Sequence, residues 1–130
     1  MADQLTQEQV ELLREKHVAQ LVTLMSDGSP HIAPLWVDTD GQNILINTEE
    51  GRVKTANMRR DARVAVGVFD AANSYTRVLN VRGTVVDITS ENARQHIDDL
   101  SEKYNGVRPY PAHNPDKDRL IVTIRPDRIY

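Results

Sequence analysis

Residues 18–48, VAQLVTLMSDGSPHIAPLWVDTDGQNILINT, decide the fold, because they alternate three apolar segments with two turn sequences. The turns are SDGS at 26–29 and DTDG at 38–41, whose residues favour tight reversals of the chain. Tight turns join antiparallel strands, whereas parallel strands need a crossover about as long as a helix. We therefore expect three successive antiparallel strands. They span residues 18–25, 30–37 and 43–48.

The rest of the chain predicts three more strands and up to three helices. Gly83, in the middle of a long strand, indicates a bulge, and Pro34 marks a sheet edge or a break in the ladder. Residues 105–118 contain three prolines and no periodicity, so we expect a loop lying over a surface. The result is a mainly β (α+β) domain, a six-stranded antiparallel barrel with flanking helices. The added strands are 62–69, 75–88 and 120–124, and the helices are about 7–17, 52–60 and 91–104.

Length and composition predict one soluble domain over residues 1–130. The net charge of −3 offers no basic field to attract nucleic acid. The chain has no cysteine, which excludes disulfides and thiol chemistry. It shows neither a signal-peptide pattern nor an apolar run of about 20 residues that could span a membrane. We therefore expect a cytoplasmic protein that does not associate with membranes.

A second stretch, ILINTEEGRVKTANMRRD at 44–61, is typical of a functional site. It predicts a strand, a turn and a helix that carries Arg52 and Lys54 in or near its first turn. Cations are disfavoured there, because a helix N-terminus already carries partial positive charge and free N–H groups. A bound anion such as a phosphate would remove that conflict. The alternative is that both cations are solvated or paired with Glu49 and Glu50.

Protein-borne catalytic motifs do not appear in the sequence. The four histidines are scattered, so we expect no metal site. No G-x-S-x-G or G-x-G-x-x-G motif occurs, which excludes those nucleophile and dinucleotide sites. Chemistry carried by a cofactor fits this pattern, with the protein supplying binding and orientation.

Three ordered segments are similar to motifs of one family. The chain resembles the split β-barrel flavin- and deazaflavin-binding proteins related to pyridoxamine 5′-phosphate oxidase, most of all the small actinobacterial type that uses the deazaflavin F420. Ala62 stands where the family usually has proline. The segments are LVTLMSDGSPHIAPLWV at 21–37, GRVKTANMRRDARVAV at 51–66 and VLNVRGTVVDI at 78–88.

The resemblance implies a cofactor site in the groove of a homodimer. Arg52 and Lys54 match the pair that holds the cofactor phosphate, with Thr55 and Asn57 as polar neighbours. The remaining matches are Ala33, Pro34, Leu35 and Trp36 along the ring, Asn47 and Thr48 beside the tail, and Tyr75 and Arg77 supplied by the partner chain. Without the resemblance, Trp36 would be interpreted as a core aromatic and Asn57 as an exposed helix residue.

Three functions follow from the resemblance. The first is an oxidoreductase in which reduced F420 donates a hydride to a small conjugated substrate. The second keeps the fold but binds FMN, and the third is a non-enzymatic cofactor carrier. Unlike FMN, F420 carries a lactyl-oligoglutamate tail that needs further cations. Candidates for contacting that tail are Arg59, Arg60 and Arg63, and candidate proton donors are Tyr75, Tyr110 and His113.

Overall fold

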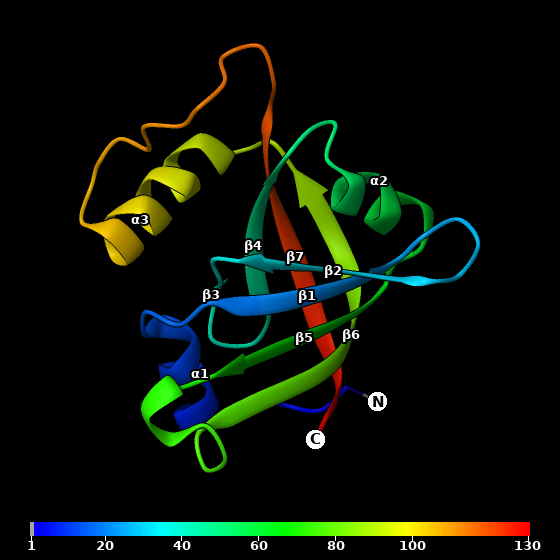
Figure 1. The fold of residues 1–130 in the computed structure, drawn as a ribbon, viewed down its shortest axis with the longest axis vertical. Helices are drawn as coiled ribbons and strands as arrows, with labels where there is room; N and C mark the ends of the chain where they lie inside the picture. Colours follow the sequence, from blue (N-terminus) through cyan, green and yellow to red (C-terminus); the bar gives the residue numbers. More distant parts are fainter. Residues whose placement is uncertain (1) are drawn as a thin grey trace.

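The computed structural model describes residues 2–130 and contains one curled β-sheet with three α-helices around it (Figure 1). In chain order the elements are α1 (Gln7–Arg14), β1 (Ala19–Leu24), β2 (Pro30–Leu35), β3 (Asp38–Thr39), β4 (Ile44–Glu49), α2 (Val53–Arg60), β5 (Arg63–Phe69), the 3₁₀ helix η1 (Ala71–Asn73), β6 (Val78–Thr89), α3 (Ala93–Asn105) and β7 (Arg119–Ile129).

The sheet has the order β2-β1-β5-β6-β7-β4-β3, and every neighbouring pair is antiparallel. It curls into a half-barrel whose edges are β2 and β3. The mainly β, α+β class and the antiparallel pairing are confirmed. So is the prediction for Pro34, which lies on edge strand β2, where its missing N–H leaves no gap in the sheet interior.

The predicted count of six strands is wrong, because the turn sequence 38–41 itself contributes a seventh. Asp38 and Thr39 form the short strand β3 against the start of β4. The Thr39 hydroxyl donates to the Asn43 carbonyl at 2.7 Å, and the Asp40 carboxylate accepts the Asn43 N–H at 2.7 Å. These side-chain bonds narrow the reversal, so pairing begins earlier than the turn residues suggested.

The last strand is longer than predicted, since β7 continues to Ile129 instead of ending at 124. The strand runs through Pro126, although proline cannot donate to a ladder. Pro126 pairs with Gly83, at the point where the register between β6 and β7 shifts. The predicted bulge at Gly83 therefore exists, and it is what allows a proline inside the strand pair.

The core fills the inside of the curl, and α1 closes one end of it. Thr6 and Gln9 form a capping box at the start of α1, which ends at Arg14, earlier than the predicted 17. Leu12 and Leu13 of α1 are buried against the sheet. Among residues 2–130, no helix is both long enough and apolar enough to cross a membrane.

A second, smaller cluster lies under α3, which buries Ile97, Leu100 and Tyr104. The Tyr104 hydroxyl donates to the His17 carbonyl at 2.6 Å and accepts the Val37 N–H at 3.1 Å. These bonds fix α3 to the chain just after β2, the edge strand next to which the candidate site lies.

Among the glycines, Gly83 is the one at which an added Cβ would meet the closest contacts. A Cβ there would lie 2.7 Å from the Arg125 carbonyl oxygen and 2.8 Å from Ile124 Cγ2. We expect Gly83→Ala to lower the free energy of unfolding by about 1–3 kcal/mol, measured by urea denaturation. Gly67→Ala is the matched control, because its Cβ would meet only the end of the Asn80 side chain, with Oδ1 at 3.2 Å. Equal losses in the two variants would contradict this account of the bulge.

Candidate functional site

Helix α2 begins without the groups that normally neutralise a helix N-terminus. Its N-cap residue is Arg52, which makes no side-chain capping bond, and its first turn contains no acidic residue. Within residues 2–130, the N–H groups of Val53, Lys54 and Thr55 find no hydrogen-bond acceptor. These donors and the helix dipole together favour an anion at this point.

The two cations of this turn differ in their surroundings. Arg52 Nε lies 3.6 Å from Glu49 Oε1, whereas Glu50 is taken by Arg59 at 2.5 and 2.6 Å. No carboxylate of the described chain lies within 4.0 Å of the Lys54 amine. Burial lowers the pKa of Lys54, and the positive charges of Arg52 and Arg119 lower it further. The alternative prediction of a pairing with Glu49 therefore holds in part for Arg52, and it does not hold for Lys54.

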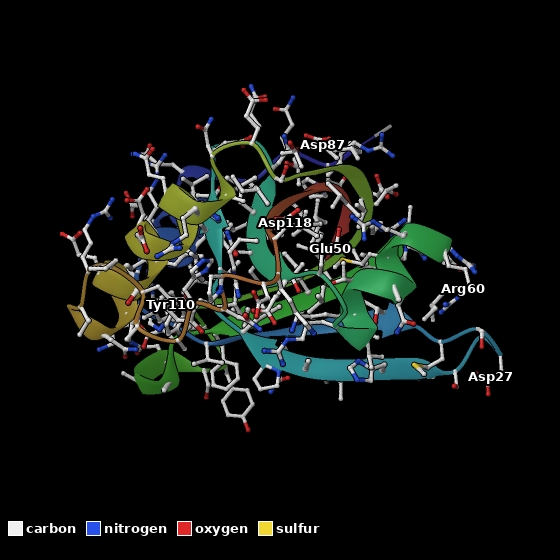
Figure 2. The ribbon with its side chains drawn as sticks, turned by 90° about the horizontal axis from the view of Figure 1, so that it is seen from above. Asp27, Glu50, Arg60, Asp87, Tyr110 and Asp118 are labelled. Carbon is white, nitrogen blue, oxygen red and sulfur yellow. The ribbon has the colours of Figure 1, made fainter. Side chains whose placement is uncertain are left out.

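Two further cations, Lys117 and Arg119, reach the start of α2 from the end of the loop before β7. Strand β7 pairs with β4 so that Arg119 lies opposite Glu49, and Arg119 Nη1 is 3.7 Å from Glu49 Oε2. Lys117 Nζ lies 3.1 Å from the position that a Cβ on Gly51 would take. The sequence did not indicate either residue, because nothing local to 117–119 shows which strand β7 joins. In Figure 2, the neighbouring residues Glu50 and Asp118 lie close together at this end of the sheet.

An open groove of about 230 Å³ lies between the end of β2, α3 and the loop after α3. Trp36 stacks on Tyr104, with ring centroids 5.2 Å apart, and meets Tyr110 edge-on at 5.9 Å. Arg119 closes the groove at its basic end, and Tyr110 comes from the predicted surface loop (Figure 2). The groove is lined by Pro34, Leu35, Trp36, Asn47, Ile97, Leu100, Tyr110 and Arg119.

The structure thus brings together the predicted ring-lining residues Pro34, Leu35 and Trp36 with Asn47 in one groove. Ala33 is half-buried on β2 and does not line it. Trp36 belongs both to the groove and to the cluster under α3, so its interpretation as a core aromatic is also partly correct.

The polar residues Thr48, Thr55 and Asn57 are buried and hydrogen-bonded inside the protein. The hydroxyls of Thr48 and Thr55 are 3.0 Å apart, and Thr55 donates to the Glu49 carbonyl at 2.9 Å. The Asn57 amide donates to the Thr23 hydroxyl at 3.0 Å. The expectation of an exposed Asn57 is therefore wrong. These three side chains join the end of β4 and strand β1 to α2, and cofactor contact by them stays a prediction.

Tyr75 and Arg77 lie near the end of α1, and Figure 1 shows this region far from α2 within one chain. Tyr75 is 98% exposed. Arg77 Nη1 binds Glu15 at 2.8 Å and Asp70 at 2.6 Å. Glu15, Asp70 and His17 have the spacing of a metal site, with ligand atoms within 4.8 Å of one another, but Arg77 already supplies the positive charge there. A role for Tyr75 and Arg77 at the cofactor thus requires a second copy of the chain.

The Arg77 network has a titration that can be measured. The hydrogen bond from Arg77, followed by that from His17, lowers the pKa of Glu15 from 4.5 to about 2. A depressed carboxyl pKa stabilises the fold above pH 4.5, and this stabilisation is lost as the pH falls toward 2. We expect Arg77→Ala to raise the Glu15 pKa toward 4.5 in an NMR titration, whereas the exposed Arg128→Ala should leave it unchanged. An unchanged pKa in Arg77→Ala would contradict the pairing.

Comparison with known proteins identifies the family of the chain. The sequence model of pyridoxamine 5′-phosphate oxidase matches residues 5–130, and the chain therefore belongs to that family, whose fold is the split barrel. Members typically bind a flavin or F420. No curated protein sequence matches the chain.

Solved structures extend the comparison. An F420 reductase is 30% identical with a TM-score of 0.82, and the match covers 92% of this chain and 94% of that one. The conserved hypothetical protein Rv2991 from Mycobacterium tuberculosis is 25% identical with a TM-score of 0.74, covering 99% and 86%. HupZ from Group A Streptococcus, 19% identical with a TM-score of 0.66 and coverages of 97% and 92%, shares the fold alone.

Proposed function

We propose that this protein is an F420-dependent oxidoreductase acting on a small conjugated organic substrate. The observation that carries the proposal is the start of α2, where the half-buried Lys54 has no acidic partner in residues 2–130 and the first-turn N–H groups have no acceptor. A phosphate satisfies all of these groups at once. Arg52 is suited to a bidentate contact, whereas Lys54 acts as a point charge.

The groove beside β2 offers the complementary surface for the cofactor ring. Trp36, Pro34 and Leu35 form an apolar wall. Contact with such a wall favours the transfer of a flat tricyclic ring from water into the groove. When bound there, reduced F420 supplies a hydride from its ring carbon C5. The residues of the chain orient the ring and exclude water. Of the three candidate proton donors, Tyr110 is the one that lines the groove.

Charge near α2 favours F420 over FMN. The three arginines first considered for the tail have partners within the chain, because Arg59 binds Glu50, Arg60 binds the Leu24 carbonyl and Arg63 binds Asp61. Lys117 lies beside Gly51 and is better placed for a tail carboxylate. The similarity to an F420 reductase points the same way. FMN, with one phosphate, remains the alternative cofactor, and binding without turnover would make the protein a carrier.

A homodimer completes this proposal, because the groove is too small alone. Its volume of about 230 Å³ lies below the roughly 300–1,000 Å³ of sites that enclose such ligands. The outer face of β1, β2, β5 and β6 carries a largely apolar hollow of about 470 Å³, where Ile32 is 62% and Tyr130 is 68% exposed. A second copy seated on this face, next to Pro34, would cover these side chains and supply the missing wall.

The phosphate contacts can be tested by mutation. We expect Arg52→Ala and Lys54→Ala each to weaken F420 binding by about 1.5–3 kcal/mol, the free energy of a charge-assisted contact. Fluorescence titration of the purified protein with F420 and with FMN measures both affinities. Lys16→Ala is the charge-matched control, since Lys16 is exposed at the end of α1. Full affinity for both cofactors in the Arg52/Lys54 double variant would contradict the proposed site.

Catalysis is tested separately from binding. The protein should catalyse hydride transfer from reduced F420 to a conjugated acceptor such as an enone or a quinone. The reaction is measured by the increase in the absorbance of oxidised F420. Lys54→Ala should slow this turnover at limiting F420. Tight F420 binding with no acceptor reduced above the protein-free rate would instead support the carrier function.

The dimer has its own test. Ile32→Glu places a charge on the apolar face, and we expect it to shift the protein from dimer to monomer in sedimentation velocity at micromolar concentration. The far-UV circular dichroism spectrum should stay that of the wild type, because Ile32 contributes to no buried cluster, although loss of the dimer contact lowers the unfolding midpoint. A wild-type protein that sediments as a monomer with cofactor bound would contradict the shared groove.

A further inference from the structure

Arg119 is a buried cation that the phosphate site does not explain. It is the first residue of β7, and its side chain is 9% exposed. Burial lowers the pKa of Arg119, so the surroundings do not favour its charge. A guanidinium placed in such a position normally has a bidentate acidic partner.

The acid facing Arg119 does not serve as that partner. Glu49 Oε2 is 3.7 Å from Arg119 Nη1, beyond hydrogen-bond distance, and the other oxygen of Glu49 faces Arg52 at 3.6 Å. Within residues 2–130, neither Nη atom of Arg119 has a hydrogen-bond acceptor and neither is fully buried, and Arg119 lines the groove. Arg119 therefore presents its free donors to the space beside Trp36.

A chain of hydrogen bonds holds the guanidinium in this orientation. Arg119 Nε donates to Asn47 Oδ1 at 2.8 Å, and Asn47 Nδ2 lies 2.9 Å from the Ala93 carbonyl and 3.1 Å from His96 Nδ1. His96 Nε2 lies 3.3 Å from Asp38 Oδ2. Since arginine only donates, the Asn47 oxygen must face it. The amide then donates to His96, which carries its proton on Nε2 and donates to Asp38.

Tyr110 fixes the plane of the guanidinium, because its ring centroid lies 5.5 Å from Arg119 Cζ. Asn47 contacts one edge of the Arg119 guanidinium, and Tyr110 covers one face. The edge formed by the two Nη atoms therefore stays free for a ligand. Such preorganisation is typical of groups that recognise a ligand, and it is unnecessary for a cation that is merely solvated.

We infer that Arg119 binds a carboxylate of a molecule held in the groove that Trp36 lines. Asn47, His96 and Asp38 act as positioning residues. The inference deepens the proposed function and rests on it only for the source of the carboxylate. That source is either the substrate itself, which would make the substrate class conjugated carboxylic acids, or the acidic tail of F420.

The fluorescence of Trp36 reports ligand binding in the groove, because Trp36 is the only tryptophan of the chain. Benzoate, with the neutral isostere benzamide as control, serves as the probe of cofactor-free protein by tryptophan fluorescence. We expect benzoate to bind about tenfold or more tightly than benzamide, as one charge-assisted pair provides. Arg119→Met should abolish this preference and Arg119→Lys should reduce it. Arg52→Met, at the phosphate end, should keep it.

The positioning residues are tested with the same ratio. His96→Phe removes the acceptor of the Asn47 amide without entering the groove, so it should lower the benzoate preference several-fold. A variant that merely loosened packing would weaken benzoate and benzamide alike. Far-UV circular dichroism verifies that each variant is folded. If Arg119→Met does not fold, the ratio of benzoate to benzamide affinity in the wild-type protein still tests the inference.

Titration of Arg119→Met with F420 and FMN identifies the source of the carboxylate. Loss of F420 affinity by about tenfold with FMN affinity kept assigns Arg119 to the cofactor tail. Unchanged affinity for both, with the benzoate preference lost, assigns it to the substrate. Equal binding of benzoate and benzamide to the wild type, or a preference that survives Arg119→Met, overturns the inference. Failure of F420 and FMN to bind would overturn the proposed function and leave the benzoate result standing.

Discussion

The antiparallel pairing of β4 with β7 is the constraint on which the site depends. It sets Glu49 opposite Arg119, so the end of one strand and the start of another, seventy positions apart in the chain, share one corner of the sheet. Helix α2 leaves β4 at this corner, and the loop that carries Tyr110 and Lys117 arrives there. The basic start of α2 and the apolar groove are therefore neighbours because of a strand register rather than because of any local motif.

This register brings several positively charged side chains together at one corner of the sheet. Arg52, Lys54 and Arg119 lie around Glu49, and burial together with the positive charges of Arg52 and Arg119 lowers the pKa of Lys54. A protein without a ligand gains nothing from this arrangement. An anionic ligand reverses the balance, since each added negative oxygen meets donors that are already oriented. The same cluster of cations would therefore provide affinity in the proposed complex.

Local chemistry predicted much of the fold. The turns at 26–29 and 38–41 indicated antiparallel hairpins, and Gly83 indicated the bulge. Arg52 and Lys54 stood out because cations oppose the helix dipole. What the sequence could not predict depends on long-range pairing. The extent of β7 past Pro126 follows from the bulge opposite it, and the roles of Arg119 and Lys117 follow from β7 joining β4. The burial of Asn57 follows from contact with Thr23 on another strand.

A crystal structure of the protein grown with F420 tests the central claim most directly. We expect the cofactor phosphate within hydrogen-bond distance of Lys54 Nζ and of the first-turn N–H groups of α2, with the ring system against Trp36 and Pro34. Density for the cofactor in another hollow, or a phosphate that leaves Lys54 without an anionic neighbour, would contradict the account.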